Sequence, residues 1–224
     1  MKLINGTSFF ISLEDPAINA HFNDAKNYTK EILHQFDTDY YIPFLDKEDR
    51  IVLDIGANIG LFTLHVLPFV EKIYSIEPTT THFNILQKLT AFSDKVVLFN
   101  KALSNTEDDV TFYITDSNTT MNSLLPTSNT FITVKACTLK SLVGLIGVTV
   151  DFCKIDIEGS ESIALTELEI ASVADRVKKF FVEFHAVNGI DFDTIRKSFI
   201  PIFEKYGYTV QLYAADSLFC KKRL

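Results

Sequence analysis

The sequence predicts an α/β fold: a mixed, mainly parallel sheet of seven strands with helices on both faces. Three observations predict it. From residue 50 onward, short apolar runs alternate with segments of helical spacing. A glycine-containing turn over residues 56–60 joins the first apolar run to the first helical segment. The chain closes with two strand-like runs separated by four residues, which is typical of a hairpin. Alternating strands and helices build a parallel sheet, and the hairpin adds an antiparallel strand.

The expected elements follow in chain order. The main strands are expected at residues 51–55, 72–77, 95–99, 148–157 and 179–184, and the hairpin strands at 208–213 and 218–221. The helices between them are expected at residues 59–67, 80–92, 138–145, 161–172 and 193–206. A further pair of strands, 109–114 and 131–136, is inserted with a polar loop over 115–130 between them.

The segment before the first strand differs from the rest. Residues 19–36 have the apolar spacing of an amphipathic helix. We therefore assign residues 1–45 to an N-terminal helical extension or cap, and residues 46–224 to the main domain. Together with the loop over 115–130, the extension is expected to wall a binding pocket at the rim of the sheet, because insertions at such a rim often carry binding residues.

Composition and charge restrict the class of protein. The 224 residues are 47% hydrophobic and 22% charged, as in a folded soluble domain. The net charge of −8 repels phosphate backbones, so we expect no nucleic acid among the partners. The three cysteines lack the spacing of a zinc site. No apolar run is long enough to span a bilayer, and a cytoplasmic location is expected. The oligomeric state is not readable from the sequence.

The turn after the first strand is a candidate ligand site. Asp54 ends the strand, where it can accept a hydrogen bond from a ligand ammonium or hold the loop. Gly56, Asn58 and Gly60 follow. Glycine lets the backbone turn tightly and approach a ligand closely, and asparagine tolerates positive φ better than most residues. Taken alone, the turn also fits a purely structural role.

Three nucleotide-type sites compete for this turn. A phosphate-binding P-loop requires a Gly-Lys-Ser/Thr ending, which is absent. The dinucleotide fingerprint requires glycines at 56, 58 and 61, where the chain has Gly56, Asn58 and Leu61. The third is the acidic-x-Gly-x-Gly-x-Gly turn that binds S-adenosylmethionine. Asp54, Gly56 and Gly60 fit it, with Asn58 as the one departure.

Glu77 strengthens the S-adenosylmethionine interpretation. It ends the second strand 21 residues after Gly56, where an acidic side chain binds the ribose hydroxyls of an adenosine ligand. The third strand is followed by residues 100–104, where the base usually lies. We expect polar contacts to the adenine from Asn100 or Ser104, and hydrophobic cover from Ile59 or Pro78 is the alternative.

With these motifs in place, the chain resembles the FkbM-type methyltransferases from about residue 51 to 185. The matching segments are VLDIGANIG (52–60), IEP (76–78), NKALS (100–104), KIDIEGSE (154–161) and EFH (183–185). The KIDIEG block is the most specific, because other methyltransferases seldom carry it. The resemblance implies a class I, Rossmann-like methyltransferase fold, S-adenosylmethionine as methyl donor and O-methylation as the typical reaction. The expected acceptor is a hydroxyl on a small molecule, sugar or natural product.

Acidic residues and one imidazole are expected at the carboxyl ends of the strands, where open α/β sheets bind ligands. Methyl transfer to oxygen needs an aligned acceptor and a group that removes its proton. The candidate catalytic residues are Asp156, His185 and Glu158, and Asp156 is also assigned to the cofactor site. The alternative for Glu158 is to cap the next helix, and His185 can instead be structural.

A divalent metal ion is conceivable on Asp156, Glu183 and His185, but no spacing specifies it, and we assign no metal site. Two other functions stay open. One is a catalytically idle S-adenosylmethionine-binding scaffold, and the other is an NAD-dependent oxidoreductase, which Asn58 and Leu61 disfavour.

Overall fold

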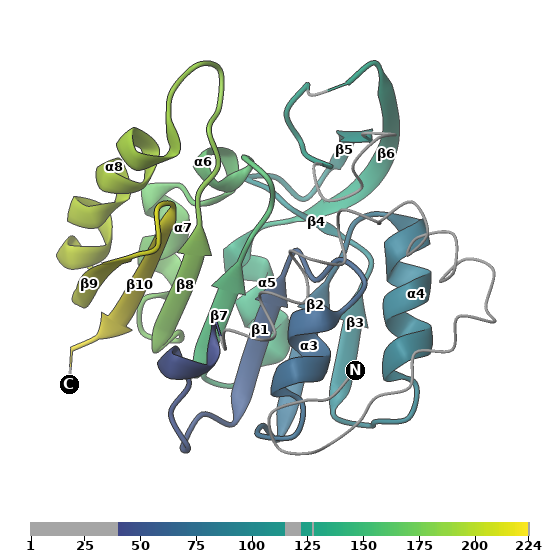
Figure 1. Ribbon diagram of the computed structural model, residues 1–224, viewed down its shortest axis with the longest axis horizontal. Helices are drawn as coiled ribbons and strands as arrows, with labels where there is room; N and C mark the ends of the chain where they lie inside the picture. The colour runs from purple at the N-terminus through teal and green to yellow at the C-terminus, as the bar shows by residue number, and fades with distance from the viewer. Residues whose placement is uncertain (1–39, 115–121, 127, 224) are drawn as a thin grey trace.

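The central sheet has the expected architecture. The computed structural model describes residues 40–114, 122–126 and 128–223 (Figure 1). In this part of the chain, seven strands form one sheet in the order β3-β2-β1-β7-β8-β10-β9. They are β1 (Ile51–Ile55), β2 (Lys72–Ile76), β3 (Val96–Phe99), β7 (Phe152–Ile155), β8 (Lys179–Glu183), β9 (Tyr208–Tyr213) and β10 (Ser217–Lys222). β10 runs antiparallel to β8 and β9, and the other pairs are parallel. The mixed, mainly parallel sheet predicted from the sequence is confirmed.

Helices cover both faces of this sheet (Figure 1). The helices are α3 (Leu61–Val66), α4 (Thr80–Thr90), α5 (Leu139–Ile146), α6 (Glu161–Ala164), α7 (Glu167–Val173) and α8 (Phe192–Lys205), preceded by the 3-10 turn η1 (Ile42–Phe44). The side chains of successive β1 residues point to opposite faces of the sheet. Val52 packs with α3 and η1, whereas Leu53 and Ile55 pack with α5 and α7.

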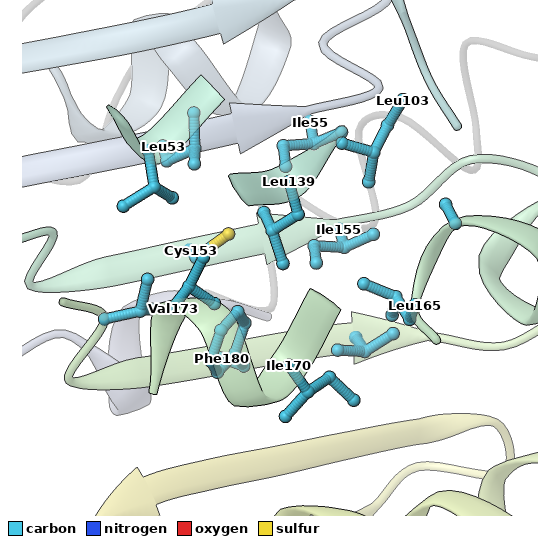
Figure 2. Packing of buried hydrophobic residues seen from close by; sticks show 14 of the residues in the cluster. Leu53, Ile55, Leu103, Leu139, Cys153, Ile155, Leu165, Ile170, Val173 and Phe180 are labelled. Atoms are coloured by element: carbon cyan, nitrogen blue, oxygen red, sulfur yellow. The ribbon is translucent and has the colours of Figure 1, made fainter. Parts of the chain in front are cut away.

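The larger core lies on the α5 and α7 face. Figure 2 shows Leu53, Ile55 and Ile155 from the sheet meeting Leu139 and Ile170 from the helices. All of these side chains are essentially inaccessible to solvent. The three free cysteines, Cys137, Cys153 and Cys220, are buried in this core. Burial raises the pKa of each thiol, so none is a reactive thiolate at neutral pH.

The inserted strands form a sheet of their own. β4 (Ala102–Leu103), β6 (Thr130–Cys137) and β5 (Asp109–Ile114) pair in the order β4-β6-β5. Figure 1 shows this small sheet beyond the carboxyl ends of β1 and β2, on the side where an α/β sheet binds ligands. The loop over 115–130 lies partly, and the helix expected at 19–36 wholly, outside the described residues.

Two expected elements differ in the structure, and the short strand β4 was not expected. The helix expected at 161–172 is divided into α6 and α7, because the Thr166 side chain accepts a hydrogen bond from the Glu169 amide and starts a new helix. The strand expected at 148–157 is shorter, ending at Ile155. After it the backbone turns, with positive φ at Glu158 and Gly159. Asp156 and Glu158 therefore do not continue the alternation of the strand.

An aromatic segment before β1 packs on the sheet. The rings of Tyr40 and Tyr41 meet Phe181 of β8, and Phe44 meets Phe181, Tyr213 and Phe219. Residues assigned to the N-terminal extension therefore contribute to the core of the main domain.

None of the helices in the described ranges combines the length and the apolar character that crossing a membrane requires.

Candidate functional site

The turn between β1 and α3 adopts a conformation that few residues allow. Gly56 and Gly60 have φ of 78° and 92°, and Asn58 has φ of 51°. A Cβ atom on Gly56 would lie 1.8 Å from the carbonyl oxygen of Asp156. The amides of Gly56 and Ala57 donate to the carbonyl of Ile76, at 3.1 and 2.9 Å. The turn is thus held between the ends of β2 and β7, and it has no room for a side chain at residue 56.

A cavity of about 280 Å³ opens beside this turn. The end of β2, the small sheet and the ends of β7 and β8 also contribute to its wall. The lining residues used below are Tyr41, Gly56, Asn58, Glu77, Lys101, Ala102, Leu103, Phe112, Lys154, Asp156, Glu158 and Glu183. Five of the residues predicted from the sequence are therefore in one cavity wall: Gly56, Asn58, Glu77, Asp156 and Glu158.

Glu77 is held rigidly at this wall. Its side chain is nearly buried. One carboxylate oxygen accepts from the Asn58 amide at 3.0 Å, and the other accepts from the Thr79 amide and hydroxyl at 2.8 and 2.6 Å. These bonds fix the carboxylate at the end of β2, next to the glycine turn, as the ribose interpretation requires.

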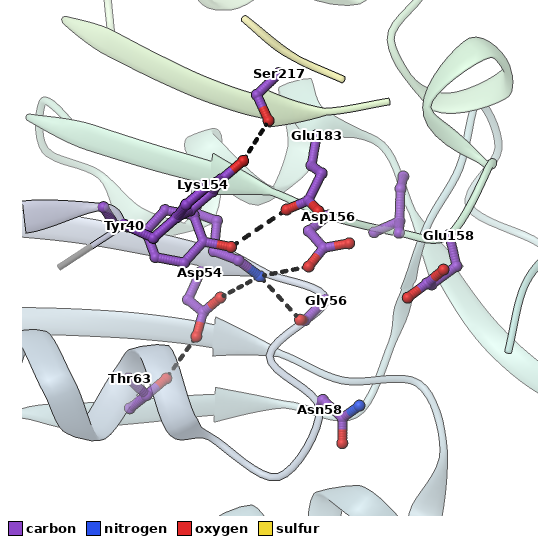
Figure 3. Close-up of polar contacts among 12 residues, drawn as sticks. Tyr40, Asp54, Gly56, Asn58, Thr63, Lys154, Asp156, Glu158, Glu183 and Ser217 are labelled. Carbon is purple, nitrogen blue, oxygen red and sulfur yellow. Dashed lines mark hydrogen bonds and ion pairs between the residues drawn. The ribbon is translucent and has the colours of Figure 1, made fainter. Parts of the chain in front are cut away.

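Asp54 lies behind the turn and does not line the cavity. One of its oxygens accepts from the Thr63 hydroxyl of α3 at 2.7 Å, and the other is 3.5 Å from Lys154 Nζ (Figure 3). Burial raises the pKa of Asp54 above its ordinary value, although Lys154 opposes that rise. Of the two roles expected for Asp54, this geometry fits holding the loop.

Lys154 is a site residue that the sequence analysis did not single out. Its Nζ lies 3.5 Å from Asp54, 3.4 Å from Asp156 Oδ2 and 3.3 Å from the Gly56 carbonyl oxygen (Figure 3). Burial works to lower the pKa of Lys154, but the charges of Asp156 and Asp54 outweigh it and hold the pKa above its ordinary value. The available signal was a lysine inside the apolar run of a buried strand, because a buried charge requires a partner.

Asn100 and Ser104 are not on the cavity wall. The Asn100 amide nitrogen donates to the carbonyl oxygens of Glu77 and Pro78, at 2.8 and 2.9 Å. Ser104 is buried, and its amide donates to the Cys137 carbonyl oxygen. Both hold loops, whereas the intervening residues 101–103 line the cavity.

Carboxylates and one imidazole lie together after β7 and β8. Asp156, Glu158 and Glu183 line the cavity there, whereas His185 and Glu161 lie behind its wall. His185 Nε2 lies 3.3 Å from a Glu158 oxygen and 3.9 Å from Asp156 Oδ1. Its Nδ1 lies 3.2 Å from Glu161. Glu183 accepts a 3.4 Å hydrogen bond from the Tyr41 hydroxyl. The three predicted catalytic residues, Asp156, Glu158 and His185, thus come together in space.

The surroundings shift the pKa values of this cluster. Burial, followed by the charge of Asp156, raises the pKa of Glu158 to about 8 and that of Glu183 to about 8. For His185, burial works to lower the pKa, but the hydrogen bond and charge of Glu161, with the other carboxylates, raise it to about 10. An imidazole with that pKa is protonated at neutral pH. A protonated imidazole has no lone pair, so it cannot accept a proton from an acceptor hydroxyl unless another cation lowers its pKa.

Comparison of the sequence with known families now adds to this geometry. The family described as "Methyltransferase FkbM domain" matches residues 54–210, which is more than half of the chain. The chain belongs to the FkbM methyltransferase family. The matched range includes the turn from Asp54, Glu77 and the acidic cluster. No curated protein sequence matches the chain.

Solved methyltransferase structures share the fold of this FkbM-family chain. Methyltransferase FkbM from Methylobacillus flagellatus KT matches with a TM-score of 0.52 and 17% identity, over 79% of this chain and 44% of that chain. The chain thus spans less than half the length of that protein. An rRNA methylase from Streptococcus thermophilus matches with a TM-score of 0.50 and 11% identity, over 83% of this chain and 93% of that one. The predicted class I methyltransferase fold is confirmed.

Proposed function

We propose that this FkbM-family protein transfers the methyl group of S-adenosylmethionine to a hydroxyl oxygen of a small molecule, sugar or natural product. One observation carries the proposal. A single cavity connects the glycine turn and Glu77 at one end with the carboxylates of Asp156, Glu158 and Glu183 at the other. The first end suits an adenosine ligand, and the second suits a positively charged methyl donor and a hydroxyl that loses its proton.

The cofactor end combines polar and apolar contacts. The Glu77 carboxylate is fixed by the amides of Asn58 and Thr79, so it can accept from ribose hydroxyls without losing further conformational freedom. Leu103 and Phe112 line the same cavity and offer apolar surface to a planar base. Gly56 lines the cavity through its backbone alone, because a side chain there would overlap the Asp156 carbonyl group.

The acceptor end supplies candidate proton acceptors. Methyl transfer breaks the sulfonium S–CH₃ bond, forms an O–CH₃ bond and releases the hydroxyl proton. Asp156 and Glu183 are the candidates to take that proton, because both carboxylates line the cavity. The field of these carboxylates also favours the cationic sulfonium over a neutral ligand.

Isothermal titration with S-adenosylmethionine tests the cofactor assignment. We expect the wild-type protein to bind, and Glu77→Ala to raise the Kd by about 10- to 100-fold, because hydrogen bonds to a charged group contribute about 1.5–3 kcal/mol. Glu71→Ala is the matched control. Its side chain is 65% exposed and lies at the other end of β2. An unchanged Kd for Glu77→Ala would show that the ribose assignment is wrong.

Turnover tests the reaction and the acceptor class. Formation of S-adenosylhomocysteine with a panel of hydroxyl compounds supports the proposed O-methylation. Cofactor binding without turnover on any acceptor favours the idle scaffold. Binding of NAD in place of S-adenosylmethionine favours the oxidoreductase. A ribosomal RNA fragment belongs in the panel, because the fold is shared with an rRNA methylase. The expectation that nucleic acid is not a partner stays a prediction.

A further inference from the structure

We propose that Asp156, Glu158 and His185 bind a divalent transition-metal ion at the acceptor end of the cavity. The role given to this ion rests on the proposed function. One ligand atom from each side chain lies within 4.8 Å of the others. Two carboxylates and an imidazole form a mixed oxygen and nitrogen donor set. That set suits Mn²⁺, Fe²⁺ or Zn²⁺ better than Ca²⁺, which prefers oxygen ligands alone.

A buried carboxylate orients the imidazole toward this point. Glu161 is 1% exposed, and one of its oxygens accepts from the amides of Ile157 and Gly159, at 3.1 and 3.3 Å. The same oxygen lies 3.2 Å from His185 Nδ1. An anchored carboxylate of this kind places the ring proton on Nδ1 and leaves Nε2 facing Asp156 and Glu158. Metal-binding histidines are held by the same carboxylate–imidazole arrangement.

The oxygen of Asp156 that faces His185 supports the same site independently. Asp156 Oδ1 is buried and accepts no hydrogen bond within the described part of the chain. The other oxygen, Asp156 Oδ2, forms an ion pair with Lys154 Nζ at 3.4 Å. When both carboxyl groups are ionised, Nε2 of the Nδ1-protonated imidazole, Asp156 Oδ1 and the Glu158 carboxylate are all acceptors, and a cation between them would satisfy all three. A metal ion or a proton on Nε2 can fill that position, and the experiment below separates the two.

The position gives the ion a role in the proposed reaction. Asp156 and Glu158 both line the cavity, so an ion between them is within reach of an acceptor hydroxyl. A divalent ion lowers the pKa of a hydroxyl that it contacts. Glu183 lies outside the three-residue ligand set but on the same cavity wall, and in its ionised form it can receive the hydroxyl proton. The oxygen then takes the methyl group, and neutral S-adenosylhomocysteine leaves.

Metal titration of the full chain tests the site without any need for turnover. Protein treated with a chelator is titrated with MnCl₂, and the free Mn²⁺ signal is followed by electron paramagnetic resonance. Zn²⁺ binding is followed by calorimetry. We expect one equivalent to bind. His185→Gln and Glu158→Gln should weaken binding at least tenfold, and Glu161→Gln by about 10- to 100-fold, as is typical for a residue that orients a ligand. Glu204→Gln, on the exposed side of α8, is the control and should bind as the wild type does.

Three results would overturn the proposal. One is a wild-type protein that binds neither ion, which leaves a proton as the cation on Nε2. Another is binding that His185→Gln and Glu158→Gln leave unchanged, which places the ion elsewhere. If circular dichroism shows that these variants do not fold, nuclear magnetic resonance of the wild type decides. Mn²⁺ should broaden the His185 ring signals first, and the third overturning result is broadening confined to other histidines. S-adenosylmethionine binding is measured separately, so loss of one assignment does not affect the other.

Discussion

At the scale of single residues, the turn from Gly56 to Gly60 depends on backbone space as much as on side-chain chemistry. Gly56 is in van der Waals contact with the backbone of Asp156, the residue that also begins the acidic cluster. Asn58 takes positive φ and donates its amide to Glu77. The glycine turn, Glu77 and the acidic cluster are thus linked by direct contacts.

Gly56→Ala tests this close approach. The new Cβ would lie 1.8 Å from a backbone oxygen, at a φ that L side chains rarely adopt. We expect a loss of about 1–3 kcal/mol in the free energy of unfolding from strain alone, and at least a tenfold weaker S-adenosylmethionine affinity. Gly144→Ala is the control, because nothing lies within 4 Å of its Cβ position in α5. That change should raise stability by about 0.5–1 kcal/mol. Urea unfolding and calorimetry measure both, and equal effects of the two substitutions would contradict the prediction.

At the scale of elements, the Asp151 carboxylate links the starts of the neighbouring strands β1 and β7. Asp151 precedes β7, and its side chain accepts from the amides of Arg50 and Ile51 at the start of β1, at 2.8 and 2.9 Å. Lys178 donates to its other oxygen at 2.6 Å. This contact aligns β1 with β7 at the ends opposite the site. The register of the two strands sets where the glycine turn meets Asp156.

Asp151→Asn should therefore destabilise the sheet in a pH-dependent manner. Burial works to raise the pKa of Asp151, but Lys178 and the two amides outweigh it and hold the pKa below its ordinary value. A lowered folded-state pKa stabilises the fold above the unfolded-state pKa, and this stabilisation is lost as pH falls through the folded-state value. At neutral pH we expect a loss of about 1–3 kcal/mol in the free energy of unfolding.

Urea unfolding across a pH series measures this effect. The difference between Asp151→Asn and the wild type should shrink as the pH falls below the ordinary aspartate pKa. The exposed Asp94, between α4 and β3, is the control position for Asp→Asn. A difference that is constant from neutral to acid pH would show that the charge of Asp151 is not responsible.

At the scale of the whole molecule, the residues before β1 join the sheet core. The Phe44 ring lies 4.6–5.1 Å from the rings of Phe219, Tyr213 and Phe181. The buried Lys179 binds Asp49 at 2.6 Å. Tyr41 extends the same segment to the acceptor end of the cavity, where its hydroxyl reaches Glu183. The segment from residue 40 therefore both covers the sheet and forms part of the cavity wall.

Two truncated chains test where the main domain begins. A chain starting at residue 46 loses Tyr41 and Phe44. It should lose about 3–5 kcal/mol in the free energy of unfolding, the usual cost of removing a buried phenylalanine side chain. A chain starting at residue 40 keeps these contacts and should unfold at a higher urea concentration than the shorter one. Matching unfolding curves would support the boundary at residues 45 and 46 that the sequence suggested.

The sequence by itself determined most of the elements and the glycine turn that borders the cavity with Glu77. Strand and helix periodicity arises from local side-chain spacing, so it located the strands of the sheet and the closing hairpin. The residues from Gly56 to Gly60, with Glu77, are specified by local backbone geometry and by position after a strand. Both signals lie within short segments, and both could therefore be read without the fold.

Tertiary structure decided what depends on contacts between distant segments. The ion pair of Lys154 with Asp54 forms only when β1 and β7 are neighbours. Asn100 was expected beside the adenine. Its side-chain amide donates to the carbonyl oxygens of Glu77 and Pro78, and these contacts depend on the fold. His185 meets Asp156 and Glu158 because the backbone turns after β7, where positive φ ends the strand alternation. No periodicity in the sequence encodes these contacts, since they are set by the packing of the sheet.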